Sequence, residues 1–340
     1  MCLYTNDKGE SEMTKLDELM ECIKQKHVFI QPHNYPDQDA LASAYGLSYL
    51  LQTKGLDTTI CYKGEIDKIN TIAMVERLGI DVKKIEDIEF MNETSEIIIV
   101  DGQKGNVNMM DFVGNEIACI DHHKMQNTDM YRFADIRSGT GACASIITSY
   151  FIENNIEIPQ NVATALFYGI KMDTNSLSRG VTDLDLLMYC KLFKIANMDE
   201  IRKLDSSTLA MEDLQAYACA INNLKVYNRV GIVNIGNDCA EAILGTMSDF
   251  ILSLQEVTFS VVYSRRAGGI KFSVRSEDDR FDAAYIIQKA LEGYGSGGGH
   301  ASMAAGFIKD VDSDDMAQEI SSVVEQRIVG LVGESLDKEN

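Results

Sequence analysis

Short apolar runs alternate with amphipathic stretches along the first half of the chain. Four runs have the length and the apolar or β-branched content of strands: His27–Pro32, Thr58–Tyr62, Ile97–Val100 and Ile117–Ile120. Four other stretches have the spacing of helices: Leu16–Gln25, Ala40–Leu51, Gly141–Ile152 and Asn161–Met172. Strands that alternate with helices predict an α/β fold with a mainly parallel sheet flanked by helices.

The second half of the chain has a different pattern. Asp183–Leu224 is helical throughout, which suits a connector between domains. After it the pattern predicts strands over Val230–Ile235, Val257–Tyr263 and Ile270–Arg275, and a strand-like run over Ala305–Ile308. It predicts helices over Ala240–Leu254, Ala283–Leu291 and Met316–Ile328. Ala267–Gly269 is typical of a hairpin turn. We therefore expect a catalytic domain over 14–190, a helical connector over 191–225 and a smaller mixed α/β domain over 226–330.

Charge and composition narrow the classes of partner. The 340 residues carry a formal net charge of −21, whereas proteins that grip long nucleic acid usually present a basic face. Small phosphorylated substrates fit this balance better than long strands. The eight cysteines include no C-x-x-C pair, and no apolar run approaches the ~20 residues of a membrane helix. With no apolar signal core in residues 1–13, the sequence predicts a cytoplasmic protein without a membrane partner.

Metal-type side chains follow three of the predicted strands. His33 follows the first strand, Asp101 follows Ile97–Val100, and the triplet Asp121-His122-His123 follows Ile117–Ile120. Asp37 and Asp39 lie in the turn after His33. In open α/β sheets ligands bind at the carboxyl ends of strands, so these side chains are expected at one site.

Each of these residues also has a purely structural interpretation. Asp37 and Asp39 could cap the helix that begins near Ala40, and Asp101 could be an ordinary turn residue. His122 and His123 could be a surface pair; in extended chain they would point to opposite sides, one toward metal and one toward substrate. Asp173 ends a helix, where a carboxylate is disfavoured unless a cation lies nearby.

Carboxylates and imidazoles without cysteine select hard or borderline metals, of which Mn²⁺, Mg²⁺ and Co²⁺ are candidates. Several aspartates with only two histidine ligands indicate two ions that share a bridging carboxylate. Such pairs, ~3.5–4 Å apart, stabilise the attacking and the leaving oxygen of phosphoryl transfer. The pattern therefore predicts a dinuclear, carboxylate-rich site.

Taken in order, these motifs resemble the DHH phosphoesterase superfamily. The segment His33–Asp39 resembles its first motif, His-x-x-x-Asp-x-Asp. Asp101 matches the second motif, Asp121-His122-His123 the triplet that gives the family its name, and Asp173 the fourth motif. The sequence departs from relatives at Gln38, where glycine is common, and over Thr174–Arg179, which differs from the nanoRNase branch.

The resemblance implies a role for each residue of the site. His33 and Asp37 would bind one metal ion, Mn²⁺ being the expected ion, and Asp39 and His122 the other. Asp101 would bridge both ions, with Asp173 close to the pair. Asp121 would support His122, and His123 would contact the substrate phosphate.

The second half carries two further elements of the resemblance. Ser273-Val274-Arg275-Ser276 and the run Gly297, Gly298, Gly299 and His300 resemble the family's C-terminal nucleotide-binding domain. Ser273, Arg275, the three glycines and His300 are therefore the expected substrate-binding residues. A glycine run could also be a flexible linker, and Arg265 and Arg266 could be charges at a hairpin edge.

The resemblance is to stand-alone enzymes of the nanoRNase/pAp phosphatase type. It implies hydrolysis of 3′,5′-bisphosphoadenosine (pAp) or of 5′-phosphorylated di- to pentanucleotides, an exonuclease activity on short nucleic acid. Cleavage of pApA or cyclic di-AMP is an alternative, and so is a nucleotide-binding regulator without turnover. Family-II pyrophosphatases share the metal motifs but not the Gly-Gly-Gly-His element, and RecJ-like exonucleases usually add an oligonucleotide-binding fold. The assembly is left open, with a homodimer as one candidate.

Overall fold

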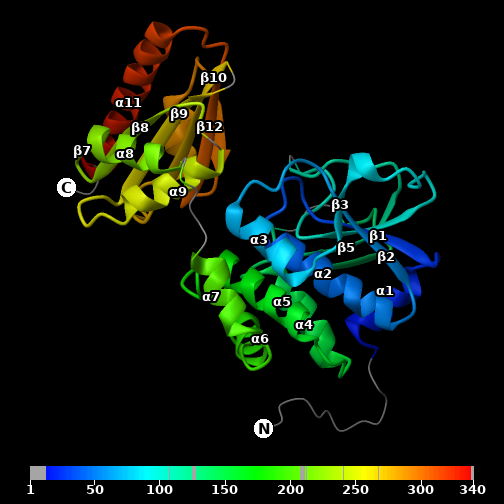
Figure 1. Cartoon of the computed structure of the whole chain (residues 1–340). Helices are drawn as coiled ribbons and strands as arrows, with labels where there is room; N and C mark the ends of the chain where they lie inside the picture. The colour runs from blue at the N-terminus through cyan, green and yellow to red at the C-terminus, as the bar shows by residue number, and fades with distance from the viewer. Residues whose placement is uncertain are drawn as a thin grey trace. The chain divides into compact units, whose positions relative to one another are not determined.

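The computed structural model describes residues 13–337, apart from residues 107, 125–127, 207–210, 212, 240 and 267. The chain divides into two compact units, residues 1–208 and 209–340 (Figure 1). The division falls inside the expected connector 191–225, within the stretch predicted to be helical throughout. Within the described residues, no helix is both long and apolar enough to cross a bilayer.

The first unit is built on a six-stranded sheet whose strands all run parallel. Its strands are β1 (His27–Gln31), β2 (Asp57–Tyr62), β3 (Val82–Lys84), β4 (Glu96–Val100), β5 (Asn115–Asp121) and β6 (Phe133–Ile136). Its helices are α1 (Lys15–Cys22), α2 (Gln38–Thr53), α3 (Ile69–Leu78), α4 (Cys143–Glu153), α5 (Gln160–Asp173), α6 (Asp183–Phe193) and α7 (Met198–Ser206), with a 3-10 turn η1 (Ile85–Asp87).

The strand order β3-β2-β1-β4-β5-β6 reverses direction between β1 and β4. The chain moves outward from β1 to β3, returns to the centre at β4, and moves outward again to β6. The loop after β1 lies beside the loop after β4, where the Asn34 N–H donates to the Asn108 carbonyl at 2.7 Å. This reversal point, at the carboxyl ends of the strands, is where open α/β sheets bind ligands.

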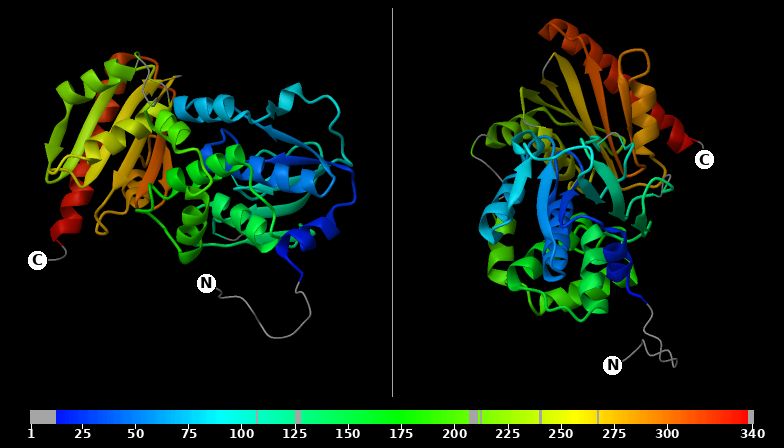
Figure 2. Two further views of the ribbon diagram at one scale, coloured as in Figure 1. Left: turned by 60° about the horizontal axis from the view of Figure 1, so that its bottom comes forward. Right: turned by 90° about the vertical axis from the view of Figure 1, so that its right-hand side faces the viewer.

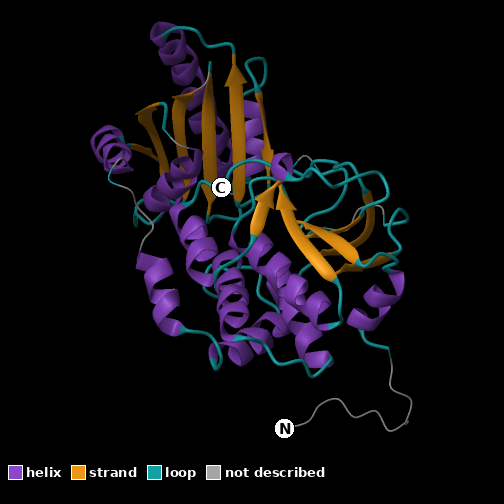
Figure 3. Cartoon of the chain, turned by 45° about the vertical axis from the view of Figure 1, so that its right-hand side comes forward, coloured by secondary structure: helices purple, strands orange, loops and turns teal. Residues whose placement is uncertain are grey.

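Helices gather on one face of this sheet, as Figure 3 shows for the first unit. Alternate strand residues such as Val28, Ile30 and Ile98 point into a core that they share with α2, α4 and α5. The intervening residues, Phe29 and Ile97 among them, pack on the other face against shorter segments, including η1 and the β4–β5 connection. The sheet is thus buried on both faces, which explains why its strands are apolar almost throughout.

A buried carboxylate at the start of β4 connects this strand to two neighbouring segments. Glu96 accepts hydrogen bonds from the backbone N–H groups of Lys24 and Gln25 and pairs with Arg132. Burial raises the pKa of Glu96, but these contacts outweigh it and hold the pKa below the ordinary 4.5. The ionised carboxylate therefore stabilises the fold above its unfolded pKa, and this stabilisation is lost as the pH falls through the folded pKa.

We expect Glu96→Gln to lower the free energy of unfolding at pH 7 by about 1–3 kcal/mol, because hydrogen bonds to a charged acceptor are lost. Urea unfolding of the two proteins should converge as the pH falls below 4.5. Glu93→Gln is the matched control, because Glu93 lies exposed in the preceding turn. A difference that stayed constant down to acid pH would contradict this assignment.

The second unit contains a mixed six-stranded sheet of order β11-β12-β10-β9-β8-β7, in which only β8 and β9 are parallel neighbours. Helices α8 and α9 pack on one face, and α10 and α11 on the other (Figure 2). Its strands are β7 (Lys225–Tyr227), β8 (Val230–Asn237), β9 (Phe259–Arg266), β10 (Gly269–Ser276), β11 (Ser296–Gly299) and β12 (Met303–Lys309). Its helices are α8 (Asp213–Asn223), α9 (Glu241–Leu252), α10 (Ala283–Ala290) and α11 (Asp314–Asp337).

The observed architecture confirms the predicted fold class, an α/β chain with a parallel first sheet and a smaller mixed second sheet. Most of the predicted strands and helices are present within a few residues of their expected ends, but α11 continues to Asp337, and the predicted helical stretch Asp183–Leu224 is divided into α6, α7 and α8. The sequence pattern missed α3 and four short strands, β3, β6, β7 and β11. The predicted turn at Ala267–Gly269 joins β9 to β10, although Ala267 lies outside the described residues.

Candidate metal centre

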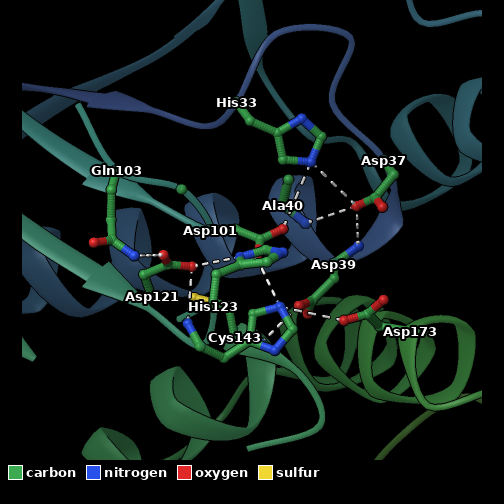
Figure 4. Close-up of polar contacts among 12 residues, drawn as sticks. His33, Asp37, Asp39, Ala40, Asp101, Gln103, Asp121, His123, Cys143 and Asp173 are labelled. Atoms are coloured by element: carbon green, nitrogen blue, oxygen red, sulfur yellow. Dashed lines mark hydrogen bonds and ion pairs between the residues drawn. The ribbon is translucent and has the colours of Figure 1, made fainter. Parts of the chain in front are cut away.

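The metal-type residues of the first unit lie together where the sheet reverses (Figure 4). His33 lies two residues after β1, and Asp101 directly follows β4 with a left-handed backbone (φ 56°). His122 directly follows β5, and Asp173 is the last residue of α5. Four elements that are distant in sequence therefore deliver side chains to one point, as the strand-end argument predicted.

The first donor group consists of His33, Asp37 and Asp101. His33 Nε2 lies 3.9 Å from Asp37 Oδ1 and 3.7 Å from Asp101 Oδ2. The second donor group consists of Asp39, His122 and Asp173. His122 Nε2 lies 3.3 Å from Asp173 Oδ2 and 3.2 Å from Asp101 Oδ1.

Asp101 joins the two donor groups. One of its carboxylate oxygens faces His33 and the other faces His122. The side chain is 4% exposed, and its Oδ1 has no hydrogen-bond partner of good geometry among the described residues. A buried carboxylate oxygen without a donor is costly unless a cation satisfies it. This arrangement fits a carboxylate shared between two cations.

Backbone carbonyls fix the orientation of both histidine rings. His33 Nδ1 lies 2.9 Å from the carbonyl of Asn34, and His122 Nδ1 lies 2.9 Å from the carbonyl of Thr140. Because a carbonyl only accepts, each Nδ1 carries the proton. In the neutral ring each Nε2 then offers a lone pair to the carboxylates. Two such acceptors facing each other repel unless a cation lies between them, and metal-binding histidines are usually oriented in this way.

The electrostatics of the cluster also favour a bound positive charge. Burial, together with the charges of Asp101 and Asp173, raises the pKa of Asp39, and burial and Asp101 raise that of Asp173 to about 6. Burial lowers the pKa of His122, but Asp101, Asp39 and Asp173 outweigh it and raise this pKa to about 11. A proton on His122 thus occupies a place that a divalent cation would take. The donor set therefore fits hard or borderline cations.

The sequence left open whether Asp37 and Asp39 cap a helix or bind metal, and the structure is compatible with both roles. Asp37 is the N-cap of α2 and accepts from the N–H groups of Asp39 and Ala40. Asp39 accepts from the N–H groups of Cys143 and Ala144 at the start of α4. Capping leaves lone pairs on each carboxylate, so the caps orient these side chains rather than exclude metal binding.

Gly169, on α5, allows Asp39 to approach this helix closely. A Cβ added to Gly169 would lie 3.1 Å from Asp39 Oδ1 and 3.2 Å from its Cα. We expect Gly169→Ala to destabilise the protein by about 1–3 kcal/mol and to weaken metal binding, because α2 and α5 must separate. Calorimetric titration with Mn²⁺ and urea unfolding would measure both.

Gly330→Ala is the control, since an added Cβ on this exposed helical residue meets nothing within 4 Å. That substitution should stabilise α11 by about 0.5–1 kcal/mol and leave metal binding unchanged. Unchanged metal affinity in Gly169→Ala would show that Asp39 does not depend on this close approach.

Asp121 holds the second histidine of the triplet. Its Oδ1 accepts from His123 Nδ1 at 2.8 Å and from the backbone N–H of His122, and its Oδ2 accepts from Gln103 Nε2 at 2.7 Å. Asp121 thus contacts His122 through the backbone and His123 through the ring. The two rings lie 4.3 Å apart instead of on opposite sides, because β5 ends at Asp121. His123 is 48% exposed, whereas His122 is 11% exposed.

Sequence reasoning missed two residues of this site. Gln103 is buried and holds Asp121, but a glutamine two residues after a motif gives no signal by itself. Arg179 donates from Nη2 to the carbonyl of Asp173 at 2.8 Å. The sequence over Thr174–Arg179 differs from that of the nanoRNase branch, and this difference could have drawn attention to Arg179.

The expected substrate residues of the second unit lie at one end of its sheet. Arg275, on β10, donates to Ser273 Oγ and pairs with Asp249 of α9. Arg275 lies opposite Met303 of β12, and the carbonyl of Met303 accepts from the N–H of the exposed His300. Polar groups from three strands therefore meet near Arg275. Arg265, by contrast, pairs with Asp314 of α11.

The glycine run is a strand and not a linker. Gly297, Gly298 and Gly299 form β11 and pair with Gly306, Ala305 and Ala304 of β12. A Cβ on Gly299 (φ 146°) would lie 2.4 Å from the carbonyl oxygen of Met303, and one on Gly297 would press on Ile287 of α10. Gly298 meets nothing within 4 Å, so its backbone is open to a ligand.

Two family models match this chain. The model of the DHH family, N-terminal domain, matches residues 27–170, and that of the DHHA1 domain matches residues 194–330. Together they cover most of the two units, including the β10–β12 region and every residue of the two donor groups except Asp173.

Three relatives illustrate the range of similar proteins. An uncharacterised protein of Methanocaldococcus jannaschii is 30% identical over 96% of this chain and 68% of its own length. The cyclic-di-AMP phosphodiesterase GdpP of Geobacillus thermodenitrificans is 24% identical over 89% of this chain and 48% of its own length. A probable manganese-dependent inorganic pyrophosphatase of Streptococcus thermophilus is 27% identical over 46% of this chain and 50% of its own length. The chain thus spans about half the length of the phosphodiesterase and of the pyrophosphatase.

Among solved structures, an exopolyphosphatase-related protein of Bacteroides fragilis superposes with a TM-score of 0.74. The superposition covers 92% of this chain and 95% of that protein, at 17% identity. At this identity the likeness concerns the fold alone, and it extends over both units.

Proposed function

Because the chain belongs to the DHH family of phosphoesterases, we propose that it hydrolyses phosphate esters of small nucleotides with the help of two divalent metal ions. The donor groups supply the observation on which this rests. Two sets of three metal-type side chains lie at the reversal point of a parallel sheet, and the buried carboxylate Asp101 of the first set also faces His122 of the second. A single structural ion would not need two such sets.

The proposed site assigns each donor group to one ion. His33 and Asp37 would hold the first ion, Asp39 and His122 the second, and Asp101 both, with Asp173 completing the second set. Bound there, two divalent cations would acidify a water molecule and offset the charge that develops on the phosphate. We favour Mn²⁺ as the ion, because one similar protein is the probable manganese-dependent inorganic pyrophosphatase of Streptococcus thermophilus.

His123 is the residue that we assign to the phosphate. Its Nδ1 is held by Asp121, so its Nε2 is free to face the exposed side of the site. An imidazole supported by a carboxylate can donate a proton to an oxygen of the substrate. Gln103 keeps Asp121 in place and thereby keeps the ring of His123 oriented.

The substrate class follows from charge and from the second unit. A chain of net charge −21 disfavours long polyanions, while a small nucleotide presents few charges. Ser273, Arg275, Gly298 and His300 would bind the remainder of the nucleotide, through their hydroxyl, guanidinium, backbone and imidazole groups. We therefore propose pAp and 5′-phosphorylated di- to pentanucleotides as substrates, with a cytoplasmic location.

Cleavage of cyclic di-AMP or pApA is the second candidate. It is favoured by the likeness to a cyclic-di-AMP phosphodiesterase over 89% of this chain, a length that includes residues of both units. The likeness to the pyrophosphatase covers 157 residues, which is too short to span both units.

A hydrolysis panel with the purified full-length chain tests the proposal. With Mn²⁺ we expect release of mononucleotide or phosphate from pAp, pApA or pGpG, and no reaction after EDTA treatment. Cyclic di-AMP, a 24-mer RNA and pyrophosphate complete the panel and separate the alternatives.

Turnover of pyrophosphate or of the 24-mer alone would overturn the substrate class. Binding of nucleotides without turnover would instead indicate a regulator. The Asp101→Asn protein is the matched control throughout, because it removes the shared carboxylate and little else.

A further inference from the structure

The loop that follows Asp173 has an unusual backbone. Three consecutive residues other than glycine adopt left-handed conformations, Asn175, Ser176 and Leu177, with φ of 46°, 57° and 65°. Each of these conformations costs free energy for an L-residue, and single occurrences are the norm. Backbone strain of this kind persists where the surrounding structure enforces it, and it clusters at functional sites.

The first half of the loop is held by Thr174, which is fully buried. Its hydroxyl donates to the carbonyl of Ile170 and accepts from the N–H of Leu177, and its carbonyl accepts from the N–H of Arg179 at 2.9 Å. The turn is thus closed onto the last turn of α5, directly beside Asp173.

The second half is held by Asp185, at the start of α6. The Asp185 carboxylate accepts from Thr182, from the N–H of Gly141 and from the hydroxyl of Ser145. Gly141 is also a point of close approach, since a Cβ there would lie 2.9 Å from the carbonyl oxygen of Gly180. Both ends of the loop are therefore fixed, and Arg179 lies between them.

This rigid loop places the Arg179 guanidinium against the second donor group. Its Nη2 donates to the Asp173 carbonyl at 2.8 Å and lies 3.9 Å from Asp173 Oδ1, while the other oxygen of Asp173 faces His122. The Arg179 side chain is 49% exposed. Among the described residues, its side chain forms hydrogen bonds and ion pairs with Asp173 alone and uses Nη2 for them, so Nε and Nη1 remain available to another acceptor.

Charge balance explains what that acceptor would be. The four carboxylates Asp37, Asp39, Asp101 and Asp173 would balance the charge of two divalent cations, so an incoming phosphate adds net negative charge to the site. A planar guanidinium has the geometry to bind two oxygens of a phosphate at once. The exposed donors of Arg179 therefore suit a phosphate, and the loop holds them beside the second donor group.

We propose that Arg179 is a substrate-binding residue whose Nε and Nη1 donate to non-bridging oxygens of the reacting phosphate. The inference rests on the proposed function, since it places the phosphate beside the metal-type cluster. It adds a positive charge that the family motifs do not supply and assigns a purpose to the segment Thr174–Arg179.

Isothermal titration of the Mn²⁺-loaded full-length chain with inorganic phosphate tests this inference. Arg179→Met should weaken phosphate binding by roughly 10- to 100-fold, the effect of losing hydrogen bonds to a charged acceptor. Arg179→Lys should give an intermediate affinity, because lysine keeps the charge but not the planar fork. Arg202→Met is the matched control, since Arg202 pairs with Asp199 on α7 and should not affect phosphate binding.

Mn²⁺ affinity, measured on the same proteins, separates binding from support of Asp173. We expect it to be unchanged in Arg179→Met. Equal phosphate affinity of Arg179→Met and wild type, or no phosphate binding by metal-loaded wild type, would overturn the inference. So would a parallel loss of Mn²⁺ affinity. Phosphate binding that depends on Arg179 without turnover of any nucleotide would overturn the proposed function alone.

Discussion

Replacing Asp101 with asparagine should lower kcat/KM for nucleotide hydrolysis by roughly 10³-fold or more, because metal ions supply several kcal/mol of transition-state stabilisation. The two carboxylate oxygens of Asp101 face one donor group each, toward His33 and toward His122. An amide carries no charge and offers one oxygen, so it cannot bridge two cations. We also expect fewer than two Mn²⁺ ions per chain in the variant, measured by mass spectrometry of the metal content.

The backbone at Asp101 decides which substitution is informative. Its φ of 56° is a conformation that asparagine tolerates and alanine resists. Asp101→Asn therefore changes the charge alone, whereas Asp101→Ala adds strain and should also lower thermal stability. Full hydrolysis by Asp101→Asn would contradict the two-ion mechanism.

Asp173→Asn should have opposite effects on the metal-free and the metal-loaded protein. Without metal, burial and the charge of Asp101 raise the pKa of Asp173 from 3.8 to about 6, so its ionised form opposes folding at pH 7. Replacing it should raise the free energy of unfolding by about 1–3 kcal/mol in EDTA. With Mn²⁺ the order should reverse, because wild type gains more binding energy.

The pH dependence follows from the direction of this shift. The native state binds the proton more tightly than the unfolded state, so this carboxyl group destabilises the metal-free protein progressively as the pH rises from 3.8 toward about 6. Urea unfolding of wild type and Asp173→Asn in EDTA should therefore coincide near pH 4 and diverge by pH 7. A wild-type protein that is the more stable one in EDTA at pH 7 would refute this account.

The metal-type cluster was predictable because parallel strands fix where their carboxyl ends lie. His33, Asp101 and Asp121–His123 follow strands whose apolar runs are visible in the sequence, and the sheet brings their ends together. The predicted fold class rests on the same regularity. The short edge strands β3 and β6 were not predicted, because a run of three or four residues that includes polar ones is too short to show a periodicity.

What the sequence could not show is which partner each polar group selects. The histidine rings are oriented by the carbonyls of Asn34 and Thr140, and any residue type would supply a carbonyl. Asp39 caps α4 from more than a hundred residues away, a contact that only the packing of α2 against α4 creates. Arg179 depends on a left-handed loop, for which Asn175, Ser176 and Leu177 give no consistent signal.

The wide spacing of the donors along the chain has a consequence for biosynthesis. His33 and Asp37 leave the ribosome early, but Asp173 is made about 140 residues later, and Asp39 is not held until α4 exists. A nascent chain that ends after β5 contains the first donor group and lacks part of the second. Binding of two ions can therefore be completed only after α5 has been synthesised and packed against α2. The second ion would then bind to the folded first unit and not to the growing chain.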